Sequence, residues 1–311
     1  MSGIESGIGS DVVAWFQSLG SPILGYILAP FHFIGGEYGY LVLLPVVYWA
    51  VSKYHGKRLM ILSLGTSHVG QYLKLVFSRP RPFQVAPDRI TPMFEQAGYG
   101  IPSGHSIFGA AIAGYAWYRF PRNWVRIVAV LFALLMGISR MVQGVHFTQD
   151  VLLGLILGLV MVVSFWWLDT RFSERMADWS VPRKLLIIMI MAAVAFVLAL
   201  VVEHEYEERK DILSVIGALV GGLAGFALEH RFVHFSSAGK IPVRIIRIVV
   251  GLVLTVGIFF GLDVLYDLIV RDATGAGALV IYVIRYGLVA AFATAGAPFL
   301  FLRLRLAEVE M

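Results

Sequence analysis

Long apolar stretches, separated by short polar connectors, dominate the pattern of this chain. A helix that crosses a membrane needs about 20 consecutive apolar residues. We expect ten stretches to form such helices, although Pro22 and Pro30 interrupt the first, which is either kinked or a shallow interfacial piece. The stretches are residues 13–34, 38–54, 58–78, 104–121, 124–141, 147–168, 184–204, 211–229, 244–266 and 278–302. The pattern therefore predicts an all-α, polytopic integral membrane bundle of about ten transmembrane helices.

The composition supports a membrane protein. The chain is 59% hydrophobic and only 14% charged, and its mean hydropathy is +0.79, whereas soluble domains are about a quarter charged. It has no cysteine, which excludes disulfides and thiolate metal sites. The net charge of +5 resides mostly in short connectors, as the positive-inside rule requires. We therefore expect membrane lipids, and no nucleic acid, around this protein.

The basic connectors also predict an orientation. Every second connector is rich in Lys and Arg, and such connectors face the cytoplasm. They lie at residues 53–58, 119–126, 171–184, 231–247 and 303–305. Both termini are then cytoplasmic, and the connectors at 79–103 and 142–146 lie on the extracytoplasmic (or lumenal) face. The first of these is long and rich in proline, which is typical of a lid or a substrate rim.

Three polar motifs occur at that face. The first runs from Lys74 to Pro82 and reads K-x6-R-P, and the second is the tetrapeptide at 102–105, which reads P-S-G-H. The third begins at Ser139 and reads S-R-x5-H-x3-D. Together they supply two histidines, one carboxylate, three cations and a turn that opens a helix, which is equipment for handling a phosphate group.

His146 and Asp150 are four residues apart at the start of an apolar stretch. This spacing places both on one helix face. A carboxylate there can hold the imidazole in one tautomer and stabilise it once it is charged. The alternative is a helix-start pair in which Asp150 merely favours the N-terminal dipole.

Ser103, Gly104 and His105 lie where a helix is expected to begin. Free amides and the helix dipole make such a position suitable for a phosphate, and His105 could deliver a proton to a leaving oxygen. Without the histidine, Ser103 would be an ordinary N-cap.

Lys74 and Arg81 flank the end of the stretch 58–78, and Arg140 lies at the end of the stretch 124–141. Converging cations match the oxygens of a phosphate, Arg by its planar fork and Lys as a point charge. The alternative for each one alone is snorkelling to the membrane interface.

Taken in order, the three motifs resemble the signature of the type 2 phosphatidic acid phosphatase (PAP2) superfamily over roughly residues 40–170. The resemblance implies a six-helix core in which His146 is the nucleophile of a phosphohistidine intermediate, Asp150 orients it and His105 protonates the leaving alcohol. The phosphoryl oxygens would be held by Lys74, Arg81, Ser103, Gly104 and Arg140. The family needs no metal or other cofactor, and no metal-ligand cluster is visible in the sequence. The longer form is loosely similar to sphingosine-1-phosphate phosphatases.

The expected protein is a metal-independent hydrolase of a lipid phosphate or a polyprenyl pyrophosphate. Residues 1–180 would form its catalytic core and residues 181–311 an additional membrane bundle. Three alternatives stay open: a lipid phosphotransferase with the same site, a sugar phosphatase similar to glucose-6-phosphatase, and a transporter or scaffold without chemistry.

Features outside the motifs have structural explanations. Gly217, Gly221 and Gly225 form a small-xxx-small stripe that lets helices approach closely, within the chain or, alternatively, in a homodimer. Asp263, Asp267 and Arg285 lie near the outer ends of the last two stretches, where we expect them to pair, because a charge in a membrane span needs a partner. The alternative is that they line a polar entry for the substrate.

Overall fold

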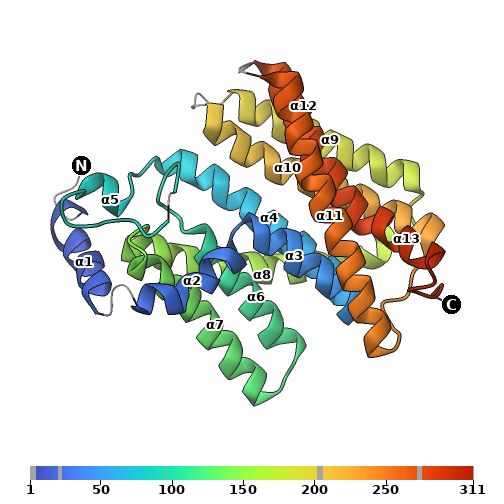
Figure 1. Ribbon diagram of the computed structural model, residues 1–311, viewed down its shortest axis with the longest axis horizontal. Helices are drawn as coiled ribbons and strands as arrows, with labels where there is room; N and C mark the ends of the chain where they lie inside the picture. Colours follow the sequence, from blue (N-terminus) through green and yellow to red (C-terminus); the bar gives the residue numbers. More distant parts are fainter. Residues whose placement is uncertain (1–4, 20–22, 95, 202–205, 272–274, 311) are drawn as a thin grey trace. The chain divides into compact units, whose positions relative to one another are not determined.

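The computed structural model describes residues 5–19, 23–94, 96–201, 206–271 and 275–310. Helices make up nearly all the regular structure of these ranges (Figure 1). The predicted all-α class is thereby confirmed. Contacts divide the chain into two compact units.

The first unit comprises Met1–Tyr40 and Gly65–Trp167. Its helices α6 and α7 are joined by a short turn at residues 120–122 and lie side by side (Figure 1). Its elements are η1 (Glu5–Gly9), α1 (Ser10–Ser18), α2 (Ile23–Gly35), α5 (Pro82–Val85), α6 (Gly104–Arg119), α7 (Asn123–Val142), most of α8 (Thr148–Ala177), the second half of α4 (Lys53–Phe77) and the start of α3 (Glu37–Val46). Every motif residue named above belongs to this unit.

The second unit comprises Leu41–Leu64 and Leu168–Met311. Its elements, besides the remaining parts of α3, α4 and α8, are η2 (Val47–Val51), α9 (Val181–Val201), α10 (Tyr206–Leu228), η3 (Glu229–Val233), α11 (Ile241–Val270), α12 (Ala276–Ala291), η4 (Phe292–Gly296) and α13 (Ala297–Arg303). The predicted division into a catalytic core at residues 1–180 and an additional membrane bundle at residues 181–311 remains a prediction.

The glycine stripe of α10 is used inside this unit. A Cβ atom at Gly217 or Gly221 would overlap the backbone carbonyls of Val283 and Gly287, and one at Gly225 would overlap Thr294 Oγ1. These glycines therefore let α10 and the α12–η4 segment pack backbone against backbone. The expected packing within the chain is confirmed, and the homodimer remains a prediction.

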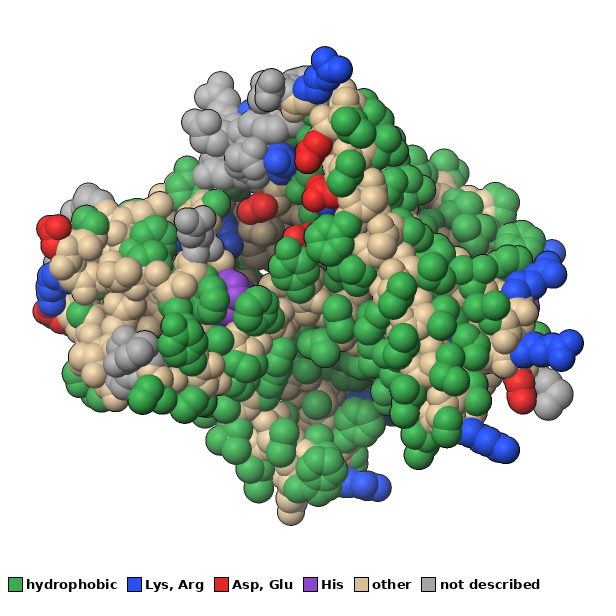
Figure 2. Space-filling model, in the orientation of Figure 1, with side chains coloured by type: hydrophobic (Ala, Val, Ile, Leu, Met, Phe, Trp, Pro, Cys, Tyr) green, Lys and Arg blue, Asp and Glu red, His purple; other side chains and the backbone are tan. Residues whose placement is uncertain are grey.

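Six helices among the described residues are long and apolar enough to cross a membrane. They are Asn123–Val142, Thr148–Met176, Val181–Val201, Arg209–Val233, Ile241–Val270 and Ala276–Arg303. Hydrophobic side chains cover most of the face seen in Figure 2, as a lipid surround requires. The chain is thus a multi-pass membrane protein.

The predicted count of ten transmembrane helices is not confirmed, because the first four stretches differ from simple spans. The stretch 13–34 consists of two separate helices, α1 and α2, and residues 20–22 between them lie outside the described ranges. The stretch 38–54 is divided among α3, the short η2 and the start of α4. Helix α4 has 25 residues but carries many polar side chains, and α6 has 16 residues, about 24 Å of helix. Apolar length alone could not reveal these breaks.

Helix α1 packs against the connector at residues 79–103. Val13 joins Ile90 and Phe147 in a small buried cluster. Asp11 Oδ1 accepts a 2.6 Å ion-paired hydrogen bond from Arg89 Nη2, and Gln17 Nε2 donates to the carbonyl of Thr91 at 2.7 Å. The connector is therefore pinned to the segment around His146 rather than extended into solvent.

Candidate active site

The three motifs converge in the first unit. Lys74 lies in the last turn of α4, Arg81 just before α5, and Arg140 in the last turn of α7. His105 stands at the beginning of α6. The loop after α7 supplies His146, and α8 supplies Asp150 in its first turn.

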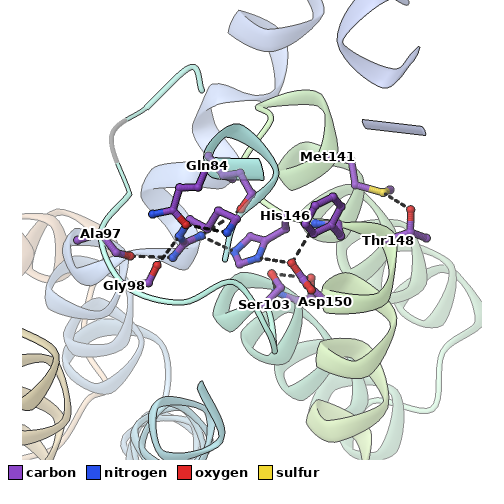
Figure 3. Close-up of polar contacts among 12 residues, drawn as sticks. Gln84, Ala97, Gly98, Ser103, Met141, His146, Thr148 and Asp150 are labelled. Atoms are coloured by element: carbon purple, nitrogen blue, oxygen red, sulfur yellow. Dashed lines mark hydrogen bonds and ion pairs between the residues drawn. The ribbon is translucent and has the colours of Figure 1, made fainter. Parts of the chain in front are cut away.

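His146 is held by Asp150 in a single tautomer. Its Nδ1 lies 3.2 Å from Asp150 Oδ2, and both side chains are 2% exposed (Figure 3). The same oxygen accepts the amide of Phe147 at 2.9 Å, so the carboxylate is fixed. A carboxylate can only accept, so Nδ1 carries the proton and Nε2 keeps a lone pair.

Arg81 confirms that tautomer from the other side of the ring. Its Nη1 lies 3.3 Å from Nε2 of His146, and a guanidinium can only donate. Three more N–H groups of Arg81 donate to the backbone oxygens of Ala97 at 2.9 Å, Gly98 at 3.0 Å and Val145 at 3.1 Å (Figure 3). The arginine thus ties the 79–103 connector to the loop that carries His146.

The surroundings of His146 favour the neutral imidazole. Burial lowers its pKa well below the ordinary value of 6.5, and the positive charge of Arg81 lowers it further. Lys74 and Arg140 act in the same direction. The three cations singled out in the sequence therefore all bear electrostatically on one nitrogen base, which stays unprotonated and nucleophilic near neutral pH.

The beginning of α6 combines a cap with open space. Ser103 is buried, and its Oγ accepts from the amide of Ser106 at 3.4 Å and from its hydroxyl at 3.0 Å, so the ordinary N-cap role is present. The amide of Ser103 donates to the carbonyl of Asp150 at 3.0 Å, which joins α6 to α8. A Cβ atom at Gly104 would meet no described atom within 4 Å. Space for an anion thus remains at this helix terminus.

His105 is oriented by α2. Its Nε2 lies 3.0 Å from the backbone oxygen of His32. Because a carbonyl only accepts, Nε2 carries a proton, and Nδ1 is the nitrogen left for exchange with another group. The structure thus gives the two motif histidines opposite tautomers.

Arg140 is almost completely buried, with 1% of its surface exposed. Its Nε donates to Ser139 Oγ at 3.2 Å, and its Nη1 to Nδ1 of His32 at 3.2 Å. Its Nη2 has no hydrogen-bond partner among the residues that the structure describes. A buried guanidinium with an unused donor is a favourable place for an anion.

Two residues of this centre, His32 and Phe94, were not expected from the sequence. His32 contacts both Arg140 and His105, and its ring stacks on Phe94 with the centroids 4.0 Å apart and the planes 7° apart. Neither residue belongs to a motif. The available signal was weak: His32 is an imidazole in an apolar stretch, between Pro30 and Gly35.

The fold and the site define a polytopic membrane protein with a buried cationic centre built around two histidines. Residues 57–174 match the model of the PAP2 superfamily, and residues 213–309 match that of the PAP2 superfamily phosphatase transmembrane extension. The chain therefore belongs to the PAP2 superfamily, as its motifs predicted.

Individual relatives agree with this assignment. Sphingosine-1-phosphate phosphatase 2 of Homo sapiens is 27% identical over 220 residues, which cover 68% of this chain and 54% of the relative. Phosphatidylglycerophosphatase B of Bacillus subtilis (strain 168) is 35% identical over 113 residues, which cover 33% of this chain and 53% of the relative. The chain thus spans about half the length of these curated relatives.

Solved structures are similar as well, among them the following one. Aquifex aeolicus LpxE has 22% sequence identity and a TM-score of 0.47, over 52% of this chain and 96% of that chain.

Proposed function

We propose that this protein is a membrane phosphatase that hydrolyses a lipid phosphate or a polyprenyl pyrophosphate through a phosphohistidine at His146. The observation that carries the proposal is the tautomer of His146. Asp150 and Arg81 constrain its two nitrogens independently, and both constraints leave the lone pair on Nε2. A base that is buried, neutral and oriented in this way suits attack on phosphorus.

In the first step, the lone pair of His146 Nε2 attacks phosphorus, and the bond from phosphorus to the leaving oxygen breaks. Protonated His105 gives a proton from Nδ1 to that oxygen, because its Nε2 proton is engaged by His32. Asp150 stabilises the positive charge that develops on His146. Water then attacks phosphorus, the P–N bond breaks and inorganic phosphate leaves.

The phosphoryl oxygens are assigned to the cations and to the start of α6. Arg140 offers its unused Nη2, Lys74 and Arg81 act electrostatically on His146, and Gly104 leaves room beside the amides of α6. Donors fixed in advance around the developing charge lower the barrier without reorganisation. Among the described residues no three His, Asp or Glu side chains could hold a metal ion together, so no step of the proposal is routed through one.

A lipid is the proposed carrier of the phosphate. The apolar helices place the chain in a bilayer, and the names of the two relatives both refer to phosphates carried by lipids. We therefore expect substrates such as sphingosine 1-phosphate, phosphatidylglycerophosphate and phosphatidic acid to be tested first.

The decisive experiment measures release of inorganic phosphate from these lipids, polyprenyl pyrophosphate and glucose 6-phosphate by the detergent-purified protein. Water is the sole acceptor, so a strict phosphotransferase releases nothing. His146→Ala should reduce turnover at least about a thousandfold, because a nucleophile cannot be replaced by its surroundings. Asp150→Asn should reduce it strongly. Near-normal release by a folded His146→Ala enzyme would remove His146 from the mechanism.

We also propose that the site opens on the extracytoplasmic (or lumenal) face. The alternation of basic connectors supports this orientation. Since the chain has no cysteine, single cysteines can be introduced without background. Gln96→Cys, in the 79–103 connector, should react with an impermeant maleimide added outside intact cells, and Ser173→Cys should not. The reverse pattern would overturn the orientation.

A further inference from the structure

We propose that His32 is a positioning residue of the phosphate site, which aims the guanidinium of Arg140 at the phosphoryl group and fixes the ring of His105. This inference rests on the proposed function, since it assigns a part to the same site. Three contacts, which involve its side-chain nitrogen, its ring and its backbone oxygen, carry it.

The first contact is between His32 Nδ1 and Arg140 Nη1, at 3.2 Å. Arginine has only donors, so Nδ1 accepts and His32 is the neutral Nε2–H tautomer. With Nε on Ser139 and Nη1 on His32, the plane of the guanidinium is defined by two fixed points. The unpartnered Nη2 then has only one direction to point, so His32 determines where that donor lies.

The second contact is the ring stack. The centroid of the His32 ring lies 4.0 Å from that of Phe94, with an interplanar angle of 7°, and 5.8 Å from that of His105, with an angle of 17°. Stacking on one side and a hydrogen bond at the edge leave the imidazole little freedom to rotate. Phe94 belongs to the 79–103 connector, so the connector holds one face of the His32 ring.

The third contact is the backbone oxygen of His32, which accepts from His105 Nε2 at 3.0 Å. It belongs to the last turn of α2, where carbonyls lack intrahelical partners and carry the negative end of the helix dipole. That end is a strong acceptor for the Nε2–H of His105, so it fixes the orientation of the ring and leaves Nδ1 for exchange with the leaving oxygen.

Gly35 makes this approach feasible. A Cβ atom at Gly35 would overlap the ring of His105 and the Cε of Met136. Gly35 and His32 are three residues apart and share one face of α2. The sequence H-F-I-G at residues 32–35 therefore brings the end of α2 against the beginning of α6.

The test compares three substitutions, using orthovanadate as a probe for the phosphate site. His32→Phe keeps a stacking ring but has no acceptor for Arg140, and His32→Asn loses the ring but keeps an oxygen close to where Nδ1 lies. His68→Phe is the matched control, because His68 is a second histidine in a helix of the same unit and lies outside the site. Affinity is measured by calorimetry on the purified protein, and lipid phosphate hydrolysis gives kcat and KM.

We expect His32→Phe to bind vanadate about tenfold more weakly or worse, the loss typical of a hydrogen bond to a charged group. His32→Asn should remain within about threefold of wild type, which is less than the smallest such loss, and His68→Phe should not differ from it. Equal affinity of His32→Phe and wild type would overturn the inference, and so would equal losses in the Phe and Asn variants. Should His32→Phe fail to fold, His32→Leu replaces it: like His32→Asn it lacks the ring, but it also lacks an acceptor for Arg140, so the two differ at the acceptor.

The outcomes also separate this inference from the proposed function. A wild-type protein that binds vanadate but releases no phosphate would refute the phosphatase, while the affinities still decide the role of His32. Normal hydrolysis together with unchanged vanadate binding in His32→Phe would refute the positioning role alone. A wild type that neither binds vanadate nor releases phosphate would refute both.

Discussion

Two buried arginines, one in each unit, show how differently the same side chain is used. Arg140 and Arg247 are each 1% exposed. Arg247 donates to backbone oxygens at distances of 2.6 to 3.3 Å, and all three of its nitrogens are engaged. These acceptors are the carbonyls of Trp49, Ser236, Ser237, Ala238 and Leu306. Arg140 has two neutral partners, and its Nη2 has none within the described ranges.

The difference indicates which arginine is structural. Burying a guanidinium is costly unless its donors are satisfied. The backbone satisfies Arg247 and is held in place in return, since residues 236–238 and the segment around Leu306 are far apart in sequence. Arg140 retains an unsatisfied donor, which a bound phosphate would engage. In the free protein, a site that binds a charged group thus bears the free-energy cost of a buried donor that has no partner.

Arg81 is an intermediate case. Three backbone oxygens hold it, as in Arg247, yet its Nη1 also contacts the nucleophilic nitrogen of His146. We therefore expect Arg81 to contribute both to local order and to the chemistry. The following experiments test whether the three arginines separate in this way.

The largest effect is expected for catalysis by Arg140→Gln. Losing one preorganised donor from a site of developing charge typically reduces the rate about 10²–10³-fold. The thermal midpoint of the variant in detergent should stay the same or rise, since a buried charge with an unsatisfied donor is gone. The rate of Arg140→Lys should lie between those of the wild type and Arg140→Gln, because lysine keeps the charge but lacks the planar fork of the guanidinium. Full turnover with a lowered thermal midpoint would make Arg140 a structural residue.

Arg247→Gln should show the opposite behaviour. Several backbone carbonyls lose their donor at once, and each unsatisfied buried group costs about 1–3 kcal/mol. We therefore expect the unfolding free energy to fall by at least about 3 kcal/mol, with a lower thermal midpoint. The turnover per folded molecule should change little. A variant with unchanged stability but impaired phosphate release would contradict the structural role.

The site could be predicted from the sequence because its charged and histidine side chains lie in three motifs with a characteristic order and spacing. Lys74, Arg81, His105, Arg140 and His146 could be singled out from residue type and spacing alone. The sequence could not show that Arg81 spends most of its donors on the carbonyls of Ala97, Gly98 and Val145, because backbone partners leave no mark on residue identity.

Tertiary contacts also explain the other features that the sequence did not predict, the role of His32 and the structure of the stretch 13–34. His32 is a lone histidine in an apolar stretch, and only the approach of α2 to α6 gives it partners. The stretch 13–34 was predicted to be a kinked span or a shallow interfacial piece. Val13 and Gln17 in this stretch, and Asp11 just before it, have partners in the 79–103 connector. Tertiary contacts of this kind override a hydropathy count, so the fold class was predictable and the number of spans was not.

The smallest effect concerns the pH dependence, and it tests whether Arg81 acts on His146. Burial and the charge of Arg81 both lower the pKa of His146 below 6.5. The nucleophile is the neutral imidazole, so the rate should fall only when the pH drops through this lowered pKa. Arg81→Met removes one of the charges that disfavour the imidazolium, and the pKa of His146 should therefore rise. The acid limb of kcat/KM should move to higher pH, while burial keeps it from reaching the value of an exposed histidine.

Residual activity suffices for this measurement, because only the shape of the profile is read. The second ionisation of the phosphate substrate is the same for both enzymes, so the difference between the two profiles reports on the protein. Arg79→Met is the matched control: Arg79 is an exposed cation two residues earlier in the same connector, and its removal should leave the acid limb in place. Coinciding limbs for wild type and Arg81→Met would show that Arg81 does not tune His146, and would group it with Arg247 as a structural arginine.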